Sequence, residues 1–246
     1  MKIIREILAR VFAVWALVIF IITFFIIFIP SMLTWLVPEP KGQDWFIRIA
    51  RLWMNIWLPL TGCPIKIMGK ENFAPGHAYI VTCNHNSMMD VPVSCPYIPG
   101  ANKTIAKSSF AKIPFFGFFY MKGSVLVNRK SEISRRRSYE KMKEVLRKGM
   151  HMSIYPEGTR NRTSEPLKKF HEGAFKLAKE TGNDIIPAIL FNTKKVLPQG
   201  KAFYFWPGKI EIHFLEPVPV GSLTVTQLKE KVFTLMKEYY VQHNHQ

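Results

Sequence analysis

The sequence predicts an α/β fold, with a mixed, largely parallel sheet flanked by helices and preceded by an N-terminal membrane-anchoring two-helix motif. From residue 64 onward, short apolar runs alternate with amphipathic helical patterns, which is typical of a parallel sheet covered on both faces. Before residue 62, long apolar stretches dominate instead. We therefore predict two units: residues 1–61 form a membrane anchor, and residues 62–246 form one α/β domain of ordinary size.

The net charge and the cysteine content restrict the classes of partner and site that the chain can have. Its 246 residues carry a formal net charge of +17, far more than solubility requires. Such an excess indicates an anionic partner, which includes nucleic acid, a membrane surface, a phosphorylated substrate or an acidic protein. The three cysteines, Cys63, Cys83 and Cys95, have no CxxC spacing. That usage favours buried thiols in a reducing compartment over a disulfide or zinc framework.

The first predicted helix is long and apolar enough to enter a bilayer. Residues 11–37 contain no charged side chain, and residues 11–29 are apolar apart from Thr23. A helix over residues 11–29 spans roughly 28 Å, close to the hydrocarbon thickness of a bilayer. The run is too long for a cleaved signal peptide. We expect Pro30 to break this helix.

A second helix is predicted at residues 44–58, after a proline-rich connector. It combines several tryptophans with Arg48 and Arg51, a composition typical of a helix at the level of lipid headgroups. We favour a monotopic anchor in which both helices enter one leaflet. The alternative is a single transmembrane span followed by a surface helix.

Periodicity and turn residues predict the remaining elements. Predicted strands lie at residues 65–68, 78–83, 104–107, 124–128, 152–155, 184–191, 202–206 and 209–215. Predicted helices lie at residues 113–120, 131–150 and 172–181, and from residue 224 onward. Thr224 and Gln227 have the spacing of a capping box, so we expect the last helix to begin at this threonine.

A histidine and an aspartate follow the buried strand at residues 78–83. Residues 84–90 read Asn-His-Asn-Ser-Met-Met-Asp, so His85 and Asp90 are five positions apart. On a single helix this spacing would turn the two side chains about 140° apart. They can act together, as a base and the carboxylate that orients it, only if His85 lies on the turn after the strand and Asp90 on the first turn of the next helix.

Two further strands end in turns that carry arginine. One run leads from Gly123 to Arg129, and another, at residues 156–160, reads Pro-Glu-Gly-Thr-Arg. The glycine of the second turn lets backbone approach a ligand closely, and Arg160 offers a planar fork suited to two phosphate oxygens. Each arginine alone is most simply a solvated surface charge. Their order after the histidine–aspartate pair instead favours a single site.

These motifs resemble those of the glycerolipid acyltransferase superfamily, and most closely those of the bacterial 1-acyl-sn-glycerol-3-phosphate acyltransferases, also called lysophosphatidic acid acyltransferases. The resemblance covers residues 63–215. The family's His-x4-Asp, arginine-bearing, Pro-Glu-Gly-Thr-Arg and proline-containing motifs match residues 85–90, 123–129, 156–160 and 186–187. The chain departs from the family after Lys107, where Ser108 and Ser109 replace an acidic residue and a leucine.

The resemblance implies transfer of an acyl chain from a thioester to the sn-2 hydroxyl of 1-acyl-sn-glycerol-3-phosphate, which gives phosphatidic acid in phospholipid biosynthesis. His85 would be the general base, and Asp90 would orient it. The implied substrate-binding residues are Arg129, Glu157, Gly158, Thr159, Arg160 and Lys107.

Within that set, the two arginines are expected to bind the substrate phosphate. Glu157 is expected to orient an arginine or a polar headgroup rather than to act as a second base. Gly158 would act through its backbone. Lys107 would either help to stabilise the thioester oxyanion or be a surface lysine.

The resemblance also implies partners and a location. The acyl donor would be an acyl-acyl-carrier protein or an acyl-coenzyme A, and the enzyme would lie on the cytoplasmic face of the inner or plasma membrane. The basic excess over residues 129–148 fits an anionic membrane surface or an acidic carrier protein, although a solvated helix face is the simpler interpretation. Residues 113–120 either line a tunnel for the acyl chain or fill the core. We expect no metal, no bound cofactor and no nucleic-acid partner.

Three alternatives remain open at this point. A related acyltransferase could use glycerol 3-phosphate or another lysophospholipid. A non-catalytic basic protein that binds membranes or RNA would leave the spacing of the histidine and aspartate unexplained. A covalent route through Cys83 is a third alternative, because strand alternation puts it on the same side as His85, although a thiol in an apolar run is more often part of the core.

Overall fold

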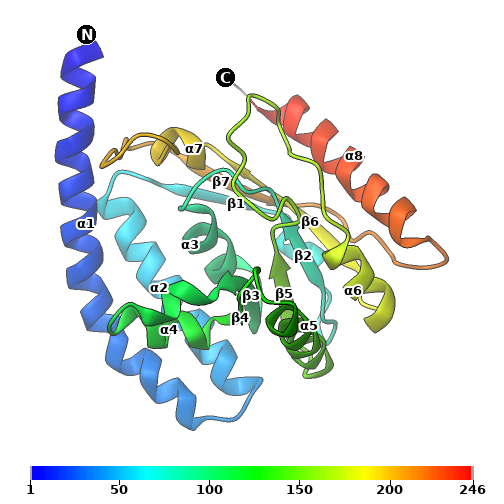
Figure 1. The fold of residues 1–246 in the computed structure, drawn as a ribbon. Coiled ribbons are helices and arrows are strands. Elements are labelled where there is room, and N and C mark those ends of the chain that lie inside the picture. The colour runs from blue at the N-terminus through cyan, green and yellow to red at the C-terminus, as the bar shows by residue number, and fades with distance from the viewer. Residues whose placement is uncertain (1, 245–246) are drawn as a thin grey trace.

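The structure, a computed structural model, describes residues 2–244 and contains a seven-stranded sheet in the order β1-β7-β6-β2-β5-β3-β4 (Figure 1). The strands are β1 (Ile65–Met68), β2 (Ile80–Cys83), β3 (Asn102–Lys107), β4 (Ser124–Val127), β5 (His151–Ile154), β6 (Ile185–Phe191) and β7 (Ile210–Phe214). β6 and β7 pair antiparallel, and the other neighbours pair parallel. The predicted α/β fold with a mixed, largely parallel sheet is confirmed.

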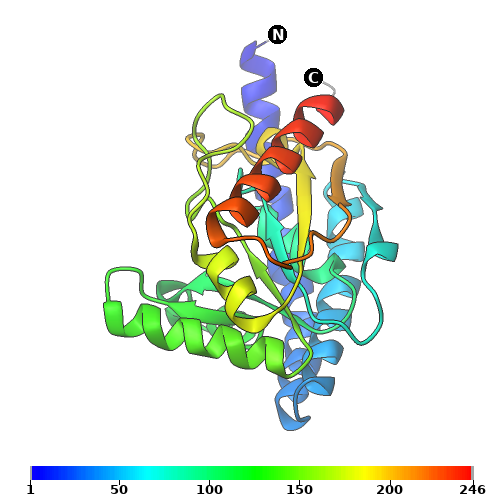
Figure 2. The same ribbon diagram turned by 90° about the vertical axis from the view of Figure 1, so that its right-hand side faces the viewer.

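Helices cover both faces of this sheet. They are α1 (Lys2–Leu33), α2 (Lys41–Leu60), α3 (Asp90–Ser94), α4 (Phe116–Lys122), α5 (Glu132–Arg147), α6 (Gly173–Thr181), α7 (Thr193–Val196) and α8 (Val225–His243). Figures 1 and 2 show α1 and α2 on one side of the sheet, and α5, α6 and α8 on the other. The sheet is therefore the middle of three layers, as crossover connections between parallel strands require.

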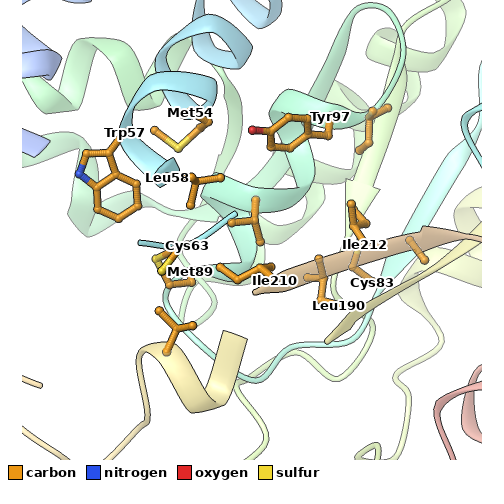
Figure 3. Close-up of a cluster of buried hydrophobic side chains, with 14 of the residues drawn as sticks. Met54, Trp57, Leu58, Cys63, Cys83, Met89, Tyr97, Leu190, Ile210 and Ile212 are labelled. Atoms are coloured by element: carbon orange, nitrogen blue, oxygen red, sulfur yellow. The ribbon is translucent and has the colours of Figure 1, made fainter. Parts of the chain in front are cut away.

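Strand alternation divides the apolar residues between two cores. Along β6, Ile186 and Leu190 join the core beneath α1 and α2, while Ile185 and Ile189 join the core beneath α5, α6 and α8. Figure 3 shows part of the first core, where side chains of α2 face β6 and β7. Full burial of one such side chain stabilises the fold by roughly 1.5–3 kcal/mol, so both faces of the central strands contribute.

The first helix does not end at its proline, which corrects the sequence prediction. α1 continues through Pro30 to Leu33 and ends in the 3-10 turn η1 (Thr34–Leu36). A proline removes one helical hydrogen bond, and here only one further turn depends on it. The stretch Lys2–Leu36 is long and apolar enough to cross a membrane, judged by length and composition alone.

The second helix packs against protein more than the sequence indicated. The rings of Trp53 and Trp57 are buried, and their indole N–H groups donate to Thr23 Oγ1 (2.8 Å) and the Ala16 carbonyl (3.1 Å) of α1. Arg51 donates to two backbone carbonyls that follow α3. The interpretation of these three side chains as lipid-headgroup contacts is therefore wrong. The predicted boundary between residues 61 and 62 stays a prediction.

Residues 202–206 do not form the predicted strand. β7 already has β6 and β1 on its two sides, so no edge is free beside it. The segment packs against α1 instead, where the backbone N–H of Phe205 donates to the Ala9 carbonyl (3.1 Å). Its aromatic side chains, which made the segment resemble a strand, contact helices: Phe12 meets Trp206 edge to face.

Most other elements lie within a few residues of their predicted positions. The capping box at the start of α8 is confirmed, with Thr224 and Gln227 exchanging side-chain and backbone hydrogen bonds. Asp90 is the first residue of α3, as the interaction with the preceding histidine requires.

Candidate active site

The predicted site residues meet at one edge of the sheet. β2, β5, β3 and β4 are parallel neighbours, with Thr82 paired to Ile154 and Lys107 paired to Val127 near their carboxyl ends. The turns that follow these strands therefore leave the same edge, which is where open α/β sheets bind ligands. His85 follows β2, and residues 156–160 follow β5.

His85 and Asp90 are in direct contact. The Asp90 Oδ2 atom lies 2.7 Å from His85 Nδ1. A carboxylate only accepts hydrogen bonds, so Nδ1 carries the proton and Nε2 has a free lone pair. The imidazole is about one fifth exposed, whereas Asp90 is fully buried. The pair thus presents one basic nitrogen outward and keeps its carboxylate out of water.

Backbone amides hold the Asp90 carboxylate in place. Its Oδ2 atom also accepts from the N–H groups of Asn86 (2.6 Å) and Ser87 (2.7 Å). Both donors lie before Asp90 in the chain, so the turn from His85 to the start of α3 folds around this carboxylate. Three donors on one oxygen stabilise a negative charge that would otherwise be costly in a fully buried position.

An aromatic ring supports the imidazole. The centroids of the His85 and Tyr155 rings are 4.4 Å apart. Tyr155 is buried, and its hydroxyl shares a 2.7 Å hydrogen bond with the Ser94 hydroxyl of α3. Burial raises the pKa of this phenol well above its ordinary value, so the ring stays neutral and packs against the imidazole. Tyr155 was not predicted as a site residue, although it directly precedes the Pro-Glu-Gly-Thr-Arg turn.

Glu157 contacts the back of the histidine turn. Its Oε1 atom accepts from the His85 backbone N–H (2.8 Å), and its Oε2 atom accepts from the Lys168 backbone N–H (3.1 Å). The residue is 1% exposed, and burial raises the pKa of this carboxyl to about 7. Contrary to the expectation that Glu157 orients an arginine or headgroup, its carboxylate positions the backbone of the histidine turn.

The pKa of Glu157 gives a test of this role. Because the pKa of Glu157 is higher in the folded protein, protonation of this carboxyl favours folding. Its contribution to the free energy of unfolding, up to about 3 kcal/mol, is fully present below the ordinary glutamate pKa and is lost as the pH rises through about 7. Glu157→Gln removes the titration and leaves one buried amide facing an N–H donor, which costs about 1–3 kcal/mol. We expect thermal unfolding in detergent to show a deficit that is larger at pH 5 than at pH 8. An equal deficit at both pH values would contradict this assignment.

Gly158 fixes the next turn. Its φ of +69° suits glycine, and a Cβ atom there would lie 2.8 Å from the His171 ring. The Arg129 guanidinium donates to the Gly158 carbonyl, and Thr159 Oγ1 accepts from Lys168 Nζ (2.7 Å). The two arginine-bearing motifs are therefore joined through Arg129.

The remaining predicted residues have few protein contacts. Arg160 is half-buried and takes part in no side-chain hydrogen bond or ion pair within residues 2–244. Lys107 is exposed at the end of β3 and likewise has no such partner in the part of the chain that the structure describes. Over the same residues, no group of three or more His, Cys, Asp or Glu side chains is placed to hold a metal ion.

Three further residues that were not predicted hold the site: Asn84 and Gln199 through their side-chain amides, and Asn161 through its backbone N–H. Asn84 exchanges two hydrogen bonds with the backbone of Leu190 on β6. The Asn161 N–H donates to the His85 carbonyl (2.6 Å), and Gln199 Nε2 donates to the Asn86 carbonyl (2.9 Å). These contacts join segments far apart in the chain, so nothing in local sequence identifies them.

Cys83 is poorly placed to act as a nucleophile. It is fully buried at the end of β2 within the core beneath α1 and α2, and burial raises the pKa of its thiol far above the ordinary value. The thiol therefore stays protonated at physiological pH. We expect Cys83→Ala to retain turnover within a few-fold of the unaltered chain, measured as thiol release from an acyl thioester. Loss comparable to that of a histidine variant would favour the covalent route.

Comparison with known proteins identifies the family and the fold of the chain. The sequence profile described as "Acyltransferase" matches residues 64–190, just over half of the chain. The 1-acyl-sn-glycerol-3-phosphate acyltransferase of Borreliella burgdorferi is 34% identical over 151 residues, which are 59% of this chain and 58% of that protein. A 1-acyl-sn-glycerol-3-phosphate acyltransferase of Chlamydomonas reinhardtii is 28% identical over 203 residues, 79% of this chain and 60% of that protein.

The matched segments thus span less than two thirds of these two relatives. Among solved structures, the crystal structure of the 1-acyl-sn-glycerophosphate (LPA) acyltransferase PlsC from Thermotoga maritima superposes with a TM-score of 0.80. It is 22% identical, and the superposition covers 98% of this chain and 97% of that one, so the fold is shared. The profile match covers the strands of this chain from β1 to β5 and nearly all of β6. The chain therefore belongs to the acyltransferase family.

Proposed function

We propose that the chain is a 1-acyl-sn-glycerol-3-phosphate acyltransferase that forms phosphatidic acid at a membrane. The observation that carries this proposal is the 2.7 Å contact between Asp90 and His85 Nδ1, because it leaves Nε2 as a base at the sheet edge where the arginine-bearing turns meet. Relatives named for this activity support the choice of substrate.

In this proposal His85 moves one proton twice. Nε2 takes the proton of the substrate's 2-hydroxyl while that oxygen attacks the carbonyl carbon of the acyl thioester. The carbon–oxygen bond of the new ester forms, the carbon–sulfur bond breaks, and the imidazolium returns its proton to the leaving thiolate. Asp90 stays ionised and stabilises the transient imidazolium through Nδ1.

In this proposal Arg129 and Arg160 have different roles in binding the substrate phosphate. Arg129 uses part of its guanidinium on the Gly158 carbonyl, which fixes the turn that carries Arg160. Within residues 2–244 the Arg160 guanidinium has no side-chain hydrogen bond or ion pair, so we assign it the main phosphate contact, with the remaining donors of Arg129 and the Thr159 hydroxyl beside it. Lys107, at the same edge, is assigned to the thioester oxyanion only by its position.

Arg160→Ala should weaken binding of the phosphate substrate. Loss of a charge-assisted hydrogen bond costs about 1.5–3 kcal/mol, which corresponds to a rise of roughly 10- to 100-fold in KM with a smaller change in kcat. Arg147→Ala is the control, because Arg147 is an exposed arginine at the end of α5, where the chain leads into the start of β5, away from the carboxyl ends of the strands. A defect confined to kcat would instead give Arg160 a role in the transition state.

We further propose that α1 anchors the enzyme in one leaflet of the inner or plasma membrane, with the α/β domain on the cytoplasmic face. Residues from Ala9 to Ile27 on one face of α1 are buried against the rest of the protein, and its other face is exposed and apolar. A helix attached along its length cannot cross the bilayer while the domain stays outside it. The net charge of +17 fits an anionic membrane surface.

The test is an assay of the purified full-length chain in detergent. Acyl-acyl-carrier protein and acyl-coenzyme A are offered as donors to 1-acyl-sn-glycerol-3-phosphate, glycerol 3-phosphate and a lysophospholipid with a larger headgroup. We expect ester formation on the first acceptor and release of one thiol per product. Preference for either of the other acceptors would identify a related acyltransferase, and no transfer with any pair would refute the proposal.

A further inference from the structure

We infer that a second element enters the lipid surface beside α1: the aromatic segment formed by η4 (Ser108–Lys112), α4 (Phe116–Lys122) and the link between them. This inference rests on the membrane anchoring proposed above and extends it to a part of the α/β domain. α4 lies beside α1 in Figure 1.

The aromatic segment exposes large apolar side chains that a solvated loop would not carry. Phe110, Ile113, Phe115 and Phe118 are 37%, 44%, 53% and 56% exposed. Soluble proteins rarely gather such side chains into one exposed patch, and a patch of this kind marks an interaction surface.

The patch is continuous with the exposed face of α1. The Phe115 ring packs edge to face against Phe25 and Phe28, with centroids 5.7 and 5.8 Å apart. Phe25 is itself 50% exposed, and its neighbour Ile26 is 69% exposed. A lipid surface that receives α1 therefore meets the aromatic segment without a gap, which selects lipid as the occupant.

The local fold holds these side chains outward. Phe115 has a φ of +58°, a backbone conformation that is costly for an aromatic residue. The inward rings of α4 pack on α1 and α2; the ring centroids of Phe119 and Phe46, for example, are 4.7 Å apart. Gly117 lies so close to the Ala111 carbonyl that a Cβ atom would fall 2.2 Å from its oxygen. The segment is thus braced from within, although its outer residues Phe110, Ile113, Phe115 and Phe118 remain 37–56% exposed.

Charge and position agree with this role. Lys107 and Lys112 flank the patch and are exposed, which suits the boundary between acyl chains and anionic headgroups. The segment also follows β3 directly, at the edge of the sheet that carries His85. Its insertion would bring that edge to the depth of lysolipid headgroups.

Site-directed spin labelling of the full-length chain tests the inference. The three native cysteines are buried, so an introduced thiol reacts selectively. Phe118→Cys is compared with Ile22→Cys on the exposed face of α1 and with Val241→Cys on α8, which are 53% and 60% exposed. Figure 1 shows α8 on the side of the molecule away from α1. Acyl transfer to detergent-solubilised substrate confirms that each labelled protein is folded.

On vesicles of phosphatidylethanolamine and phosphatidylglycerol, we expect labels at 22 and 118 to become accessible to oxygen and protected from a water-soluble nickel chelate. The label at 241 should stay accessible to the chelate. A lipid-exposed label at 22 with an aqueous label at 118 would overturn the inference and leave the α1 anchor intact. Aqueous labels at both sites would overturn the anchor as well. Protection of residue 118 without vesicles, increasing with protein concentration, would indicate self-association and also overturn the inference.

Discussion

Replacing His85 by alanine is expected to lower kcat by at least about 10²–10⁴-fold, the usual contribution of a general base. The reason is geometric: Nδ1 is held by Asp90, so Nε2 is the nitrogen that takes the substrate proton. The measurement is release of thiol from the acyl thioester with lysophosphatidic acid in excess. KM for the phosphate substrate should change little, because His85 has no role in binding the phosphate.

Two companion variants separate loss of the base from loss of structure. His85→Asn can place an amide N–H where Nδ1–H donates to Asp90 but has no second nitrogen, so it should lose as much activity as alanine. His77→Ala removes an exposed histidine from the loop before β2 and should be neutral. If His85→Asn kept most of the activity, the ring would serve only to support the turn and the general-base assignment would fail.

The order of elements could be predicted because it depends on local patterns. The apolar run of β6 is buried along its whole length, and the capping residues of α8 make the hydrogen bonds expected of them. The site was also predictable in outline, because parallel strands deliver the turns after β2, β4 and β5 to one edge. Residue type and strand end together selected His85 and Asp90, which are in direct contact, and the turn that carries Arg160, whose role stays a prediction.

What could not be predicted depends on contacts between distant segments. Residues 202–206 have the composition of a strand, but the neighbours of β7 leave no edge for them, and that is a property of the whole sheet. Trp53 and Trp57 have the composition of a lipid-facing helix, yet both indoles bind to α1. Glu157 was expected to orient an arginine or a polar headgroup, and only the return of the chain at Lys168 shows that its carboxylate accepts from two backbone amides.

Asp90→Asn should lower kcat by at least about 100-fold and should leave KM for lysophosphatidic acid nearly unchanged. The carboxamide oxygen can take the place of Oδ2 and accept from the amides of Asn86 and Ser87, so the turn keeps its shape. The charge is lost, however, and the imidazolium that forms in the transition state then has no counter-ion. The cost appears in kcat because the ground state carries a neutral imidazole.

A buried aspartate also makes structural contributions, so the control must distinguish the two. Asp44→Asn removes a carboxylate from a surface pair with Arg48 and should affect neither kcat nor folding. The Oδ1 atom of Asp90 is buried without a protein hydrogen bond among residues 2–244, so the amide nitrogen of the variant would be unsatisfied there and lower the unfolding temperature. If the loss in kcat followed this destabilisation and disappeared at a lower assay temperature, Asp90 would serve only to hold the turn before α3. If the loss in kcat persisted at temperatures where both proteins stay folded, it would reflect the missing charge beside His85.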